Sequence, residues 1–347
     1  MKLKKELKVI FLNITIVAFS LSLFGCGEVE AGKENYIMGT IVNLKAYGSK
    51  KSTRDALEAA TTRLSEIENK MSVNKSDSEV SKINNNAGFK HQKVSEDIYY
   101  VLNKAMEYAK LSKGNFDITV EPLVKLWGIG TKNAHVPSLN EIERAKALIN
   151  YKYLNIKSKK EAYLEKKDMA IDLGGIAKGY AADEIKTIFK EKGIKSAFIN
   201  IGGNVNLLGK KTDGTPWKIG IQNPLKDKGE YMGVLTLEDK SIVTSGNYER
   251  YFIENGKRYH HIFDVKTGYP SENGIISATI VSEKSIDGDA LSTTTYVLGV
   301  ADAMNLIESI KGVEGVFITK DKKVYITSGL KESFELTDKT FTSKNIN

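Results

Sequence analysis

Two apolar, strand-like segments of the sequence end in pairs of glycines, and this feature constrains the fold more than any other. Ile171–Leu173 leads into Gly174–Gly175, and Ile199–Ile201 leads into Gly202–Gly203. Glycine pairs expose backbone N–H and C=O groups, so a ligand can approach the chain closely at such a turn. The first pair also precedes a helical segment that carries Lys178. We therefore expect two strand ends that line one phosphate-binding cleft, with two unrelated tight turns as the alternative.

Periodicity in the rest of the chain predicts both helices and strands. A helix-rich first half and a strand-rich second half indicate an α+β fold, with mixed sheets and flanking helices. One domain is expected over residues 36–335, with a possible subdomain break near residues 150–160. Helices are expected from about Ser52, over Ser95–Lys113, from Ser138 to about Asn150, over Lys178–Lys192 and over Ala290–Ile310. Strands are expected over Tyr36–Ala46, Met169–Leu173, Ala197–Ile201, Trp217–Ile221, Gly233–Leu237, Ile276–Val281, Val316–Thr319 and Val324–Thr327.

Residues 1–25 differ in composition from the rest of the chain. Four lysines precede an apolar run, Val9–Phe24, that contains no charged residue. This layout is typical of a secretory signal and is too short for an ordinary membrane span. The run leads to Cys26, which resembles the lipidated cysteine of a bacterial lipoprotein, and residues 26–35 are expected to form a tether. An uncleaved anchor is the alternative. Both place the domain at the extracytoplasmic face of a bacterial cell membrane.

Composition excludes several kinds of site and partner. Cys26 is the only cysteine, which excludes an internal disulfide and a cysteine-based zinc site. The formal net charge is +8, and because residues 1–25 carry +3 of it, the remainder is close to +5. Its lysines alternate with acidic residues and form no aromatic-basic patch, so nucleic acid is not expected as a partner.

Asp289 and Thr293 form a possible metal site. They are four residues apart, which places a carboxylate and a hydroxyl about one turn apart on one face of a helix. Oxygen ligands suit a hard cation such as Mg²⁺, which keeps several waters or phosphate oxygens in its coordination shell. The alternative is that Asp287 or Asp289 caps the start of its own helix.

The dipeptide His260–His261 contains two of the four histidines in the sequence. Adjacent residues of a strand point to opposite faces, so only one of the two can enter a given cleft. A neutral histidine there could accept a proton from a hydroxyl nucleophile near pH 7. A core or surface position is the alternative for each.

Eight segments, taken together in this order, resemble the ApbE family, the FAD:protein FMN transferases. The resemblance extends from Met38 to Gly299 and implies a T-fold-like catalytic domain, with FAD in a cleft between two subdomains. The segments are MGT, MSVNKSDSEVSKIN, FDITVEPLVKLWGIG, IDLGGIAKGYAAD, INIGGN, TSGNYERYF, HHIFDVKTGYP and DGDALSTTTYVLG.

The resemblance also implies an activity. Members are Mg²⁺-dependent enzymes that cleave the pyrophosphate of FAD, transfer FMN to a threonine hydroxyl of an acceptor protein and release AMP. Their acceptors include extracytoplasmic subunits of respiratory complexes of the Rnf or sodium-pumping quinone reductase type.

Site residues follow from the same resemblance. The implied metal ligands are Asp289, Thr293 and the carbonyl of Gly175. His261 occupies the position of the base that deprotonates the acceptor threonine, so His261 and Asp289 are the expected catalytic residues. Contacts to FAD are implied for Met38, Asn74, Asn115, Phe116, Asp117, Asp172, Lys178 and Phe263.

Asn74 departs from some family members, which carry tyrosine at this position. An amide cannot shield the pyrophosphate by stacking on a ring as tyrosine can, so water has easier access to the phosphates. The sequence therefore leaves open an FAD pyrophosphatase that yields FMN and AMP. A flavin-binding lipoprotein without catalysis is the second alternative.

Overall fold

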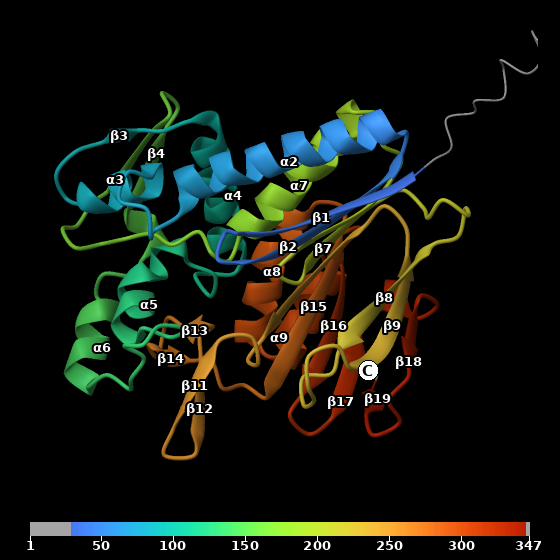
Figure 1. Ribbon diagram of the computed structural model, residues 1–347. Coiled ribbons are helices and arrows are strands. Elements are labelled where there is room, and N and C mark those ends of the chain that lie inside the picture. Colours follow the sequence, from blue (N-terminus) through green and yellow to red (C-terminus); the bar gives the residue numbers. More distant parts are fainter. Residues whose placement is uncertain (1–28, 345–347) are drawn as a thin grey trace, which may run out of the picture.

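The computed structural model describes residues 29–344, and its central element is a nine-stranded sheet (Figure 1). The signal segment and Cys26 lie outside the described residues. In order across the sheet, the strands are β1 (Val29–Ile37), β2 (Thr40–Gly48), β6 (Ser196–Ile201), β7 (Asn204–Leu208), β10 (Ser241–Gly246), β15 (Ile275–Ser282), β16 (Glu314–Thr319), β17 (Lys323–Ile326) and β19 (Thr342–Lys344). Neighbouring strands are antiparallel except β17 and β19, which are parallel.

Four smaller sheets and a set of helices complete the described structure. The sheets are β18 (Phe334–Leu336) with β9 (Tyr231–Leu237) and β8 (Trp217–Gln222), β3 (Gln92–Lys93) with β5 (Glu161–Leu164) and β4 (Leu154–Lys157), and the pairs β11 (Tyr251–Glu254) with β12 (Lys257–His260) and β13 (Phe263–Asp264) with β14 (Tyr269–Pro270). The α-helices are α2 (Lys50–Met71), α3 (Glu79–Asn85), α4 (Glu96–Leu111), α5 (Glu121–Trp127), α6 (Leu139–Lys146), α7 (Ala177–Glu191), α8 (Ser285–Leu298) and α9 (Val300–Glu308).

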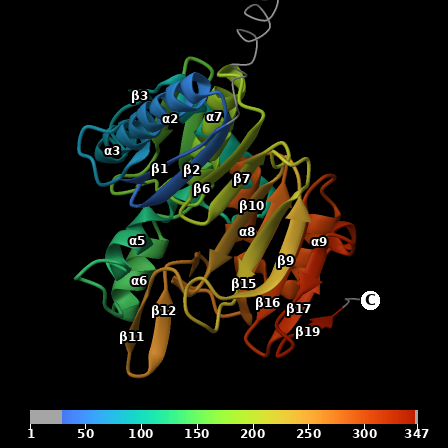
Figure 2. The same ribbon diagram turned by 45° about the vertical axis from the view of Figure 1, so that its right-hand side comes forward.

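The nine-stranded sheet lies between helices and the β8–β9–β18 sheet (Figures 1 and 2). Successive side chains of β16 pack alternately into the cores on the two faces of this sheet. Phe317 packs into the core on the helix side, whereas Val316 and Ile318 pack into the core on the small-sheet side. Because successive strand residues point to opposite faces, a fully apolar strand buries both of its faces. The expected α+β fold with mixed sheets and flanking helices is confirmed.

A third, smaller core surrounds Trp127 at the end of α5. The indole contacts the rings of Phe252, Tyr259, Phe263 and Tyr269 at centroid distances of 5.5–6.5 Å, and its Nε1 donates to the carbonyl of Gly268 at 3.0 Å. This cluster fixes α5 and α6 against the β11–β12 and β13–β14 hairpins. It therefore positions the chain that leads from β12 into His261.

The predicted strand over Met169–Leu173 is wrong, because this segment joins no sheet. The amide of Asn84 bonds both backbone groups of Ile171, at 2.8 and 3.0 Å, and the N–H of Asp172 donates to the carbonyl of Ile118. The Asn84 side chain and the backbone of Ile118 thus satisfy the N–H and C=O groups that a strand would pair with its neighbour. Only the second glycine pair, Gly202–Gly203, follows a true strand, β6.

Two other predicted elements are divided in the structure. The segment Tyr36–Ala46 contains a tight turn at Met38–Gly39, with φ of 58° and 68°, which separates β1 from β2. Positive φ at both central residues gives the twist that a two-residue hairpin favours. The expected helix over Ala290–Ile310 begins earlier, at Ser285, and Gly299, with φ of 82°, separates α8 from α9.

The boundaries of the domain also differ from expectation. Residues 29–35 of the expected tether belong to β1, and β19 continues the fold beyond residue 335. One hydrophobic core includes residues on both sides of positions 150–160, among them Leu102 and Ile199. Within residues 29–344, no helix is long and apolar enough to cross a membrane.

Candidate active site at the start of helix α7

Helices α7 and α8 pack so closely that each supplies the cap of the other. Asp289 of α8 accepts a hydrogen bond at 2.8 Å from the N–H of Gly179, in the first turn of α7. Asp183 of α7 accepts from the N–H groups of Ser285 and Ile286, at 2.7 and 2.9 Å. Neither helix has a cap from its own N-cap residue, so these carboxylates satisfy exposed N–H groups in trans.

Gly179 permits this approach. A Cβ at this position would lie 2.3 Å from the carbonyl oxygen of Ser285 and 2.7 Å from Cβ of Asp289. The alternative that Asp289 caps its own helix is thus wrong, because the helix that it caps is α7. Asp287 does not cap α8 either; it pairs with Lys104 of α4 at 3.1 Å.

The predicted metal ligands lie together beside this junction. Asp289 uses Oδ2 to cap α7, and among residues 29–344 the one hydrogen-bond partner of Oδ1 is Lys178, at 3.5 Å. The hydroxyl of Thr293 lies 3.5 Å from the Cβ position of Gly175. The N–H of Gly179 donates to Asp289, so it makes no helical bond to the carbonyl of Gly175. Oδ1 of Asp289, the hydroxyl of Thr293 and the carbonyl of Gly175 therefore retain coordinating capacity. We call these three oxygen groups the metal corner.

These groups fit a magnesium ion. All three donors are oxygens, the chemistry that Mg²⁺ prefers, and a site with one carboxylate leaves positions for waters and phosphate. Residues 29–344 contain no cluster of three or more His, Cys, Asp or Glu side chains that could bind a metal alone. Two further hydroxyls adjoin the site: Ser245 lies 2.8 Å from Ser292 and 3.5 Å from Thr293, oxygen to oxygen.

Lys178 extends over the same glycines. Its ammonium donates to the carbonyl of Gly174 at 2.8 Å and approaches Oδ1 of Asp289 at 3.5 Å. The side chain therefore places a positive charge at the start of α7, where the helix dipole also favours an anion.

Arg250, the residue before the β11–β12 hairpin, orients His261. Its Nδ1 and its main-chain N–H both lie 3.2 Å from the carbonyl oxygen of Arg250. A carbonyl oxygen can only accept, so Nδ1 carries the hydrogen and Nε2 keeps its lone pair. Burial, with the positive charges of Arg250 and Lys178 nearby, lowers the pKa of His261 to about 3. The imidazole is thus a neutral base with a free Nε2.

His260 is a core residue. It is 4 % exposed, its Nε2 bonds the carbonyl of Ser271 at 3.0 Å, and its Nδ1 accepts from the N–H of Ile262. Burial lowers its pKa to about 4, so it stays neutral in the fold. The structure thus assigns the two adjacent histidines to different environments, as strand geometry predicts.

Asp172 forms a carboxyl pair with Glu121, a residue outside the predicted site. Burial and the charge of Asp172 raise the pKa of Glu121 to about 8, and Oε2 of Glu121 is buried with no hydrogen-bond partner in the described part of the chain. Asp172 itself accepts from the N–H of Gly174. A glutamate that holds its proton beside an aspartate is typical of two carboxyl groups that share one site.

The segment Asn115–Asp117 lies partly at the site. The ring of Phe116 is 3.2 Å from the Cβ position of Gly175, so it contacts the metal corner directly. Asn115 donates from its amide to the carbonyl of Ser112 at 2.6 Å. Asp117 is buried and accepts from Thr119 and from the N–H of Tyr151, which uses both of its oxygens within the protein.

The other implied FAD contacts are more scattered. Met38 occupies the β1–β2 turn, where its N–H donates to Glu68 at 2.7 Å. Phe263 is buried in the Trp127 cluster, 6.0 Å from the indole, and Asn74 is exposed in the loop after α2. Within residues 29–344 no hydrogen bond joins these three residues to the metal corner, so a bound dinucleotide would have to connect them.

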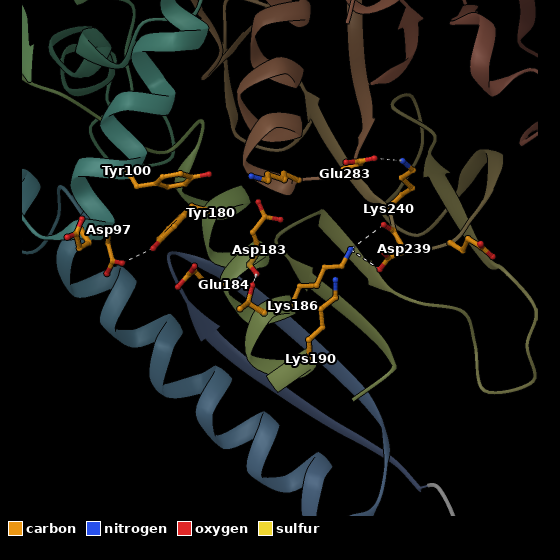
Figure 3. Close-up of a pocket in the computed structure, with 14 residues that line it drawn as sticks. Asp97, Tyr100, Tyr180, Asp183, Glu184, Lys186, Lys190, Asp239, Lys240 and Glu283 are labelled. Carbon is orange, nitrogen blue, oxygen red and sulfur yellow. Dashed lines mark hydrogen bonds and ion pairs between the residues drawn. The ribbon is translucent and has the colours of Figure 1, made fainter. Parts of the chain in front are cut away.

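A cavity of about 1000 Å³ lies elsewhere, beside the start of α8 (Figure 3). Its lining includes Tyr100, Tyr180, Asp183, Lys186 and Asp239. None of the predicted site residues lines it. Lys186 and Asp239 pair with each other at 3.1 Å across it, and the carboxylate of Asp183 is used as a cap. The oxygen groups of Asp289, Thr293 and Gly175 that retain coordinating capacity lie outside this cavity.

Comparisons with known proteins identify the family of this chain. Residues 38–317 match the model of the ApbE family. A FAD:protein FMN transferase from Klebsiella pneumoniae is 34% identical over 84% of this chain and 90% of its own, and one from Treponema pallidum is 31% identical over 90% and 91%. The ApbE protein of Thermotoga maritima superposes with a TM-score of 0.81 at 33% identity, over 87% of this chain and 98% of its own. The chain therefore belongs to the ApbE family.

Proposed function

We propose that this protein transfers FMN from FAD to a threonine hydroxyl of an acceptor protein and releases AMP. The observation that carries the proposal is the convergence of an oxygen-lined corner, formed by Asp289, Thr293 and Gly175, with Lys178 and a neutral His261. Relatives named FAD:protein FMN transferases, and the solved flavin transferase of Vibrio cholerae, support the same reaction class.

The residues have distinct tasks in this reaction. The acceptor threonine oxygen attacks the phosphorus of the FMN half, a new P–O bond forms, and the bond between that phosphorus and the bridging oxygen of the pyrophosphate breaks. AMP leaves with the bridging oxygen. Nε2 of His261 accepts the threonine proton, because Nδ1 is held as a donor by Arg250. Lys178 offsets negative charge on the phosphates.

Magnesium would be held by Asp289, Thr293 and the carbonyl of Gly175. When bound, it supplies Lewis-acid polarisation of the phosphate and stabilises the leaving oxygen. The capping bond from Gly179 holds the Asp289 carboxylate in one orientation, so the ligand is in place before substrate arrives.

The acceptor is expected to be an extracytoplasmic subunit of a respiratory complex of the Rnf or sodium-pumping quinone reductase type. The signal segment and Cys26 support a lipid-anchored enzyme at that face of the membrane.

The test combines purified protein, FAD, Mg²⁺ and a recombinant threonine-bearing Rnf subunit. Mass spectrometry should show the subunit heavier by one FMN, and a variant subunit with valine at the acceptor threonine should stay unmodified. AMP should appear in equal amount. If FAD stays intact with both Rnf and sodium-pump subunits, the proposal is wrong.

The second candidate is an FAD pyrophosphatase. The observation that favours it is Asn74, whose side chain is exposed and presents no ring to cover the phosphates. Release of AMP from FAD and Mg²⁺ without any acceptor would identify this activity. Asn74→Tyr should then slow acceptor-free release and leave transfer to the subunit intact.

A further inference from the structure

Arg250 is an exposed, always charged side chain at the edge of the site that neither the metal corner nor the implied FAD contacts include. Among residues 29–344 its guanidinium forms no ion pair with a carboxylate. Its one side-chain hydrogen bond is long, 3.5 Å from Nη2 to the carbonyl oxygen of Gly39. Most of its five N–H donors therefore have no protein partner.

Arg250 adjoins three other segments of the chain. Its guanidinium lies beside Gly39, in the turn that carries Met38, and its Cδ lies 3.8 Å from the Cβ position of Gly130. Both glycines have positive φ, 68° and 87°, and neither has a side chain that would fill the space around the guanidinium. Its main-chain carbonyl is the group that orients His261.

We propose that Arg250 binds a phosphate oxygen of the dinucleotide, as a second cation in addition to Lys178. The inference rests on the proposed function, because the dinucleotide is the substrate named there. A planar guanidinium with unused donors matches the geometry of phosphate oxygens and binds them with two parallel hydrogen bonds. One residue then contacts the substrate through its side chain and orients the base through its backbone.

This arrangement links substrate binding to proton transfer. The charged or titratable groups that affect His261 are Arg250, His260 and Lys178, and the two cations disfavour its protonated form. A bound pyrophosphate neutralises both cations, so the imidazolium that forms during the reaction is less destabilised. His261 thus becomes a stronger base when the dinucleotide is in place.

Calorimetric titration with ADP and with adenosine, in Mg²⁺, tests the phosphate contact. The two ligands share the nucleoside and differ in the phosphates. Arg250→Met should bind ADP about 10- to 100-fold more weakly, the range for a lost charge-assisted hydrogen bond, with adenosine unchanged. Arg250→Lys should recover part of the ADP affinity, because it keeps the charge and loses the planar fork.

Arg258→Met is the matched control. Arg258 lies on β12, in the hairpin that follows Arg250, and its guanidinium lies 4.2 Å from the ring centroid of Tyr251. Its loss removes one positive charge from the hairpin, and ADP should bind as in the wild type. A cooperative thermal transition shows that each variant is folded. If Arg250→Met does not fold, the ADP affinity of Arg250→Lys alone tests the phosphate contact.

Two results would overturn the inference. In the first, Arg250→Met binds ADP as tightly as the wild type does. In the second, Arg250→Met loses the same factor of affinity for ADP and for adenosine, which would mean general damage to the pocket.

Transfer to the Rnf subunit is measured separately. Absence of transfer in the wild type would contradict the proposed function, whereas normal transfer with unchanged ADP binding in Arg250→Met would contradict only the role of Arg250.

Discussion

At the scale of single residues, His261 combines a fixed tautomer with a depressed pKa. We expect His261→Gln to reduce the transfer rate by about 10²- to 10⁴-fold, the usual contribution of a general base. FAD binding, followed by flavin fluorescence, should persist because Lys178 and the metal corner remain. His135→Gln, at an exposed position, is the control. A transfer rate within a few-fold of the wild type in His261→Gln would remove this residue from the mechanism.

The pH profile of the wild type gives a second check on His261. Its pKa in the free protein is lowered to about 3, so the neutral form dominates at every pH above about 4. The value of kcat/KM reports groups of the free enzyme. It should therefore show no loss that centres on pH 6.5, where an ordinary histidine titrates.

Glu121 predicts an unusual dependence of stability on pH. Its pKa is raised to about 8 in the fold, against 4.5 for the ordinary group, so the folded state holds a proton that the unfolded state releases. The resulting stability is fully present below pH 4.5 and is lost as the pH rises toward 8. Glu121→Gln keeps the shape without this titration. Its melting temperature should exceed that of the wild type most clearly at pH 8.5.

Glu191→Gln, at the exposed end of α7, is the control for this comparison and should follow the wild type at each pH. A constant difference in melting temperature between Glu121→Gln and the wild type from pH 4.5 to 8.5 would mean that Glu121 ionises normally.

At the scale of elements, the contact of α7 with α8 forms the metal corner. In an ordinary helix Gly→Ala stabilises by up to about 1 kcal/mol, but at Gly179 the added Cβ meets backbone of α8. We expect Gly179→Ala to destabilise the fold by about 1–3 kcal/mol, in the range of overpacking, and to displace Asp289. Thermal unfolding and Mn²⁺ binding measure both effects.

Gly32→Ala is the matched control, because a Cβ there meets nothing closer than the carbonyl oxygen of Leu44 at 3.6 Å. It should change the free energy of unfolding by no more than a few tenths of a kcal/mol. Its Mn²⁺ affinity should equal that of the wild type. Unchanged Mn²⁺ affinity in Gly179→Ala would show that the site does not depend on this helix contact.

At the scale of the whole molecule, Cys26 lies just before β1, so a lipid there would attach the sheet to a membrane through a very short segment. We expect the full chain, expressed in a bacterium, to incorporate labelled palmitate and to sediment with membranes. Cys26→Ala should lose the label, and Ser22→Ala should keep it. A Cys26→Ala chain that stays fully membrane-bound would favour the uncleaved anchor instead.

Much of the local structure could be predicted from residue spacing. The helices expected from Ser95 and from Ser138 both start there, because each serine caps its helix by accepting from an N–H group three residues later. The one-turn relation of Asp289 and Thr293 also needs only a helix. The strand over Met169–Leu173 could not be excluded in this way, since the Asn84 side chain that replaces its ladder is 87 residues away.

The sequence by itself thus determined the class of fold, the glycine turns and the oxygen ligands that one helix can present, because these follow from short-range geometry. Only the tertiary structure decided which carboxylate caps which helix, which of the two adjacent histidines is buried in the core and where Arg250 lies. Asp289 and Gly179 are separated by 110 positions, and Arg250 and Gly39 by 211. Contacts over such separations depend on how whole layers pack, and no local spacing encodes them.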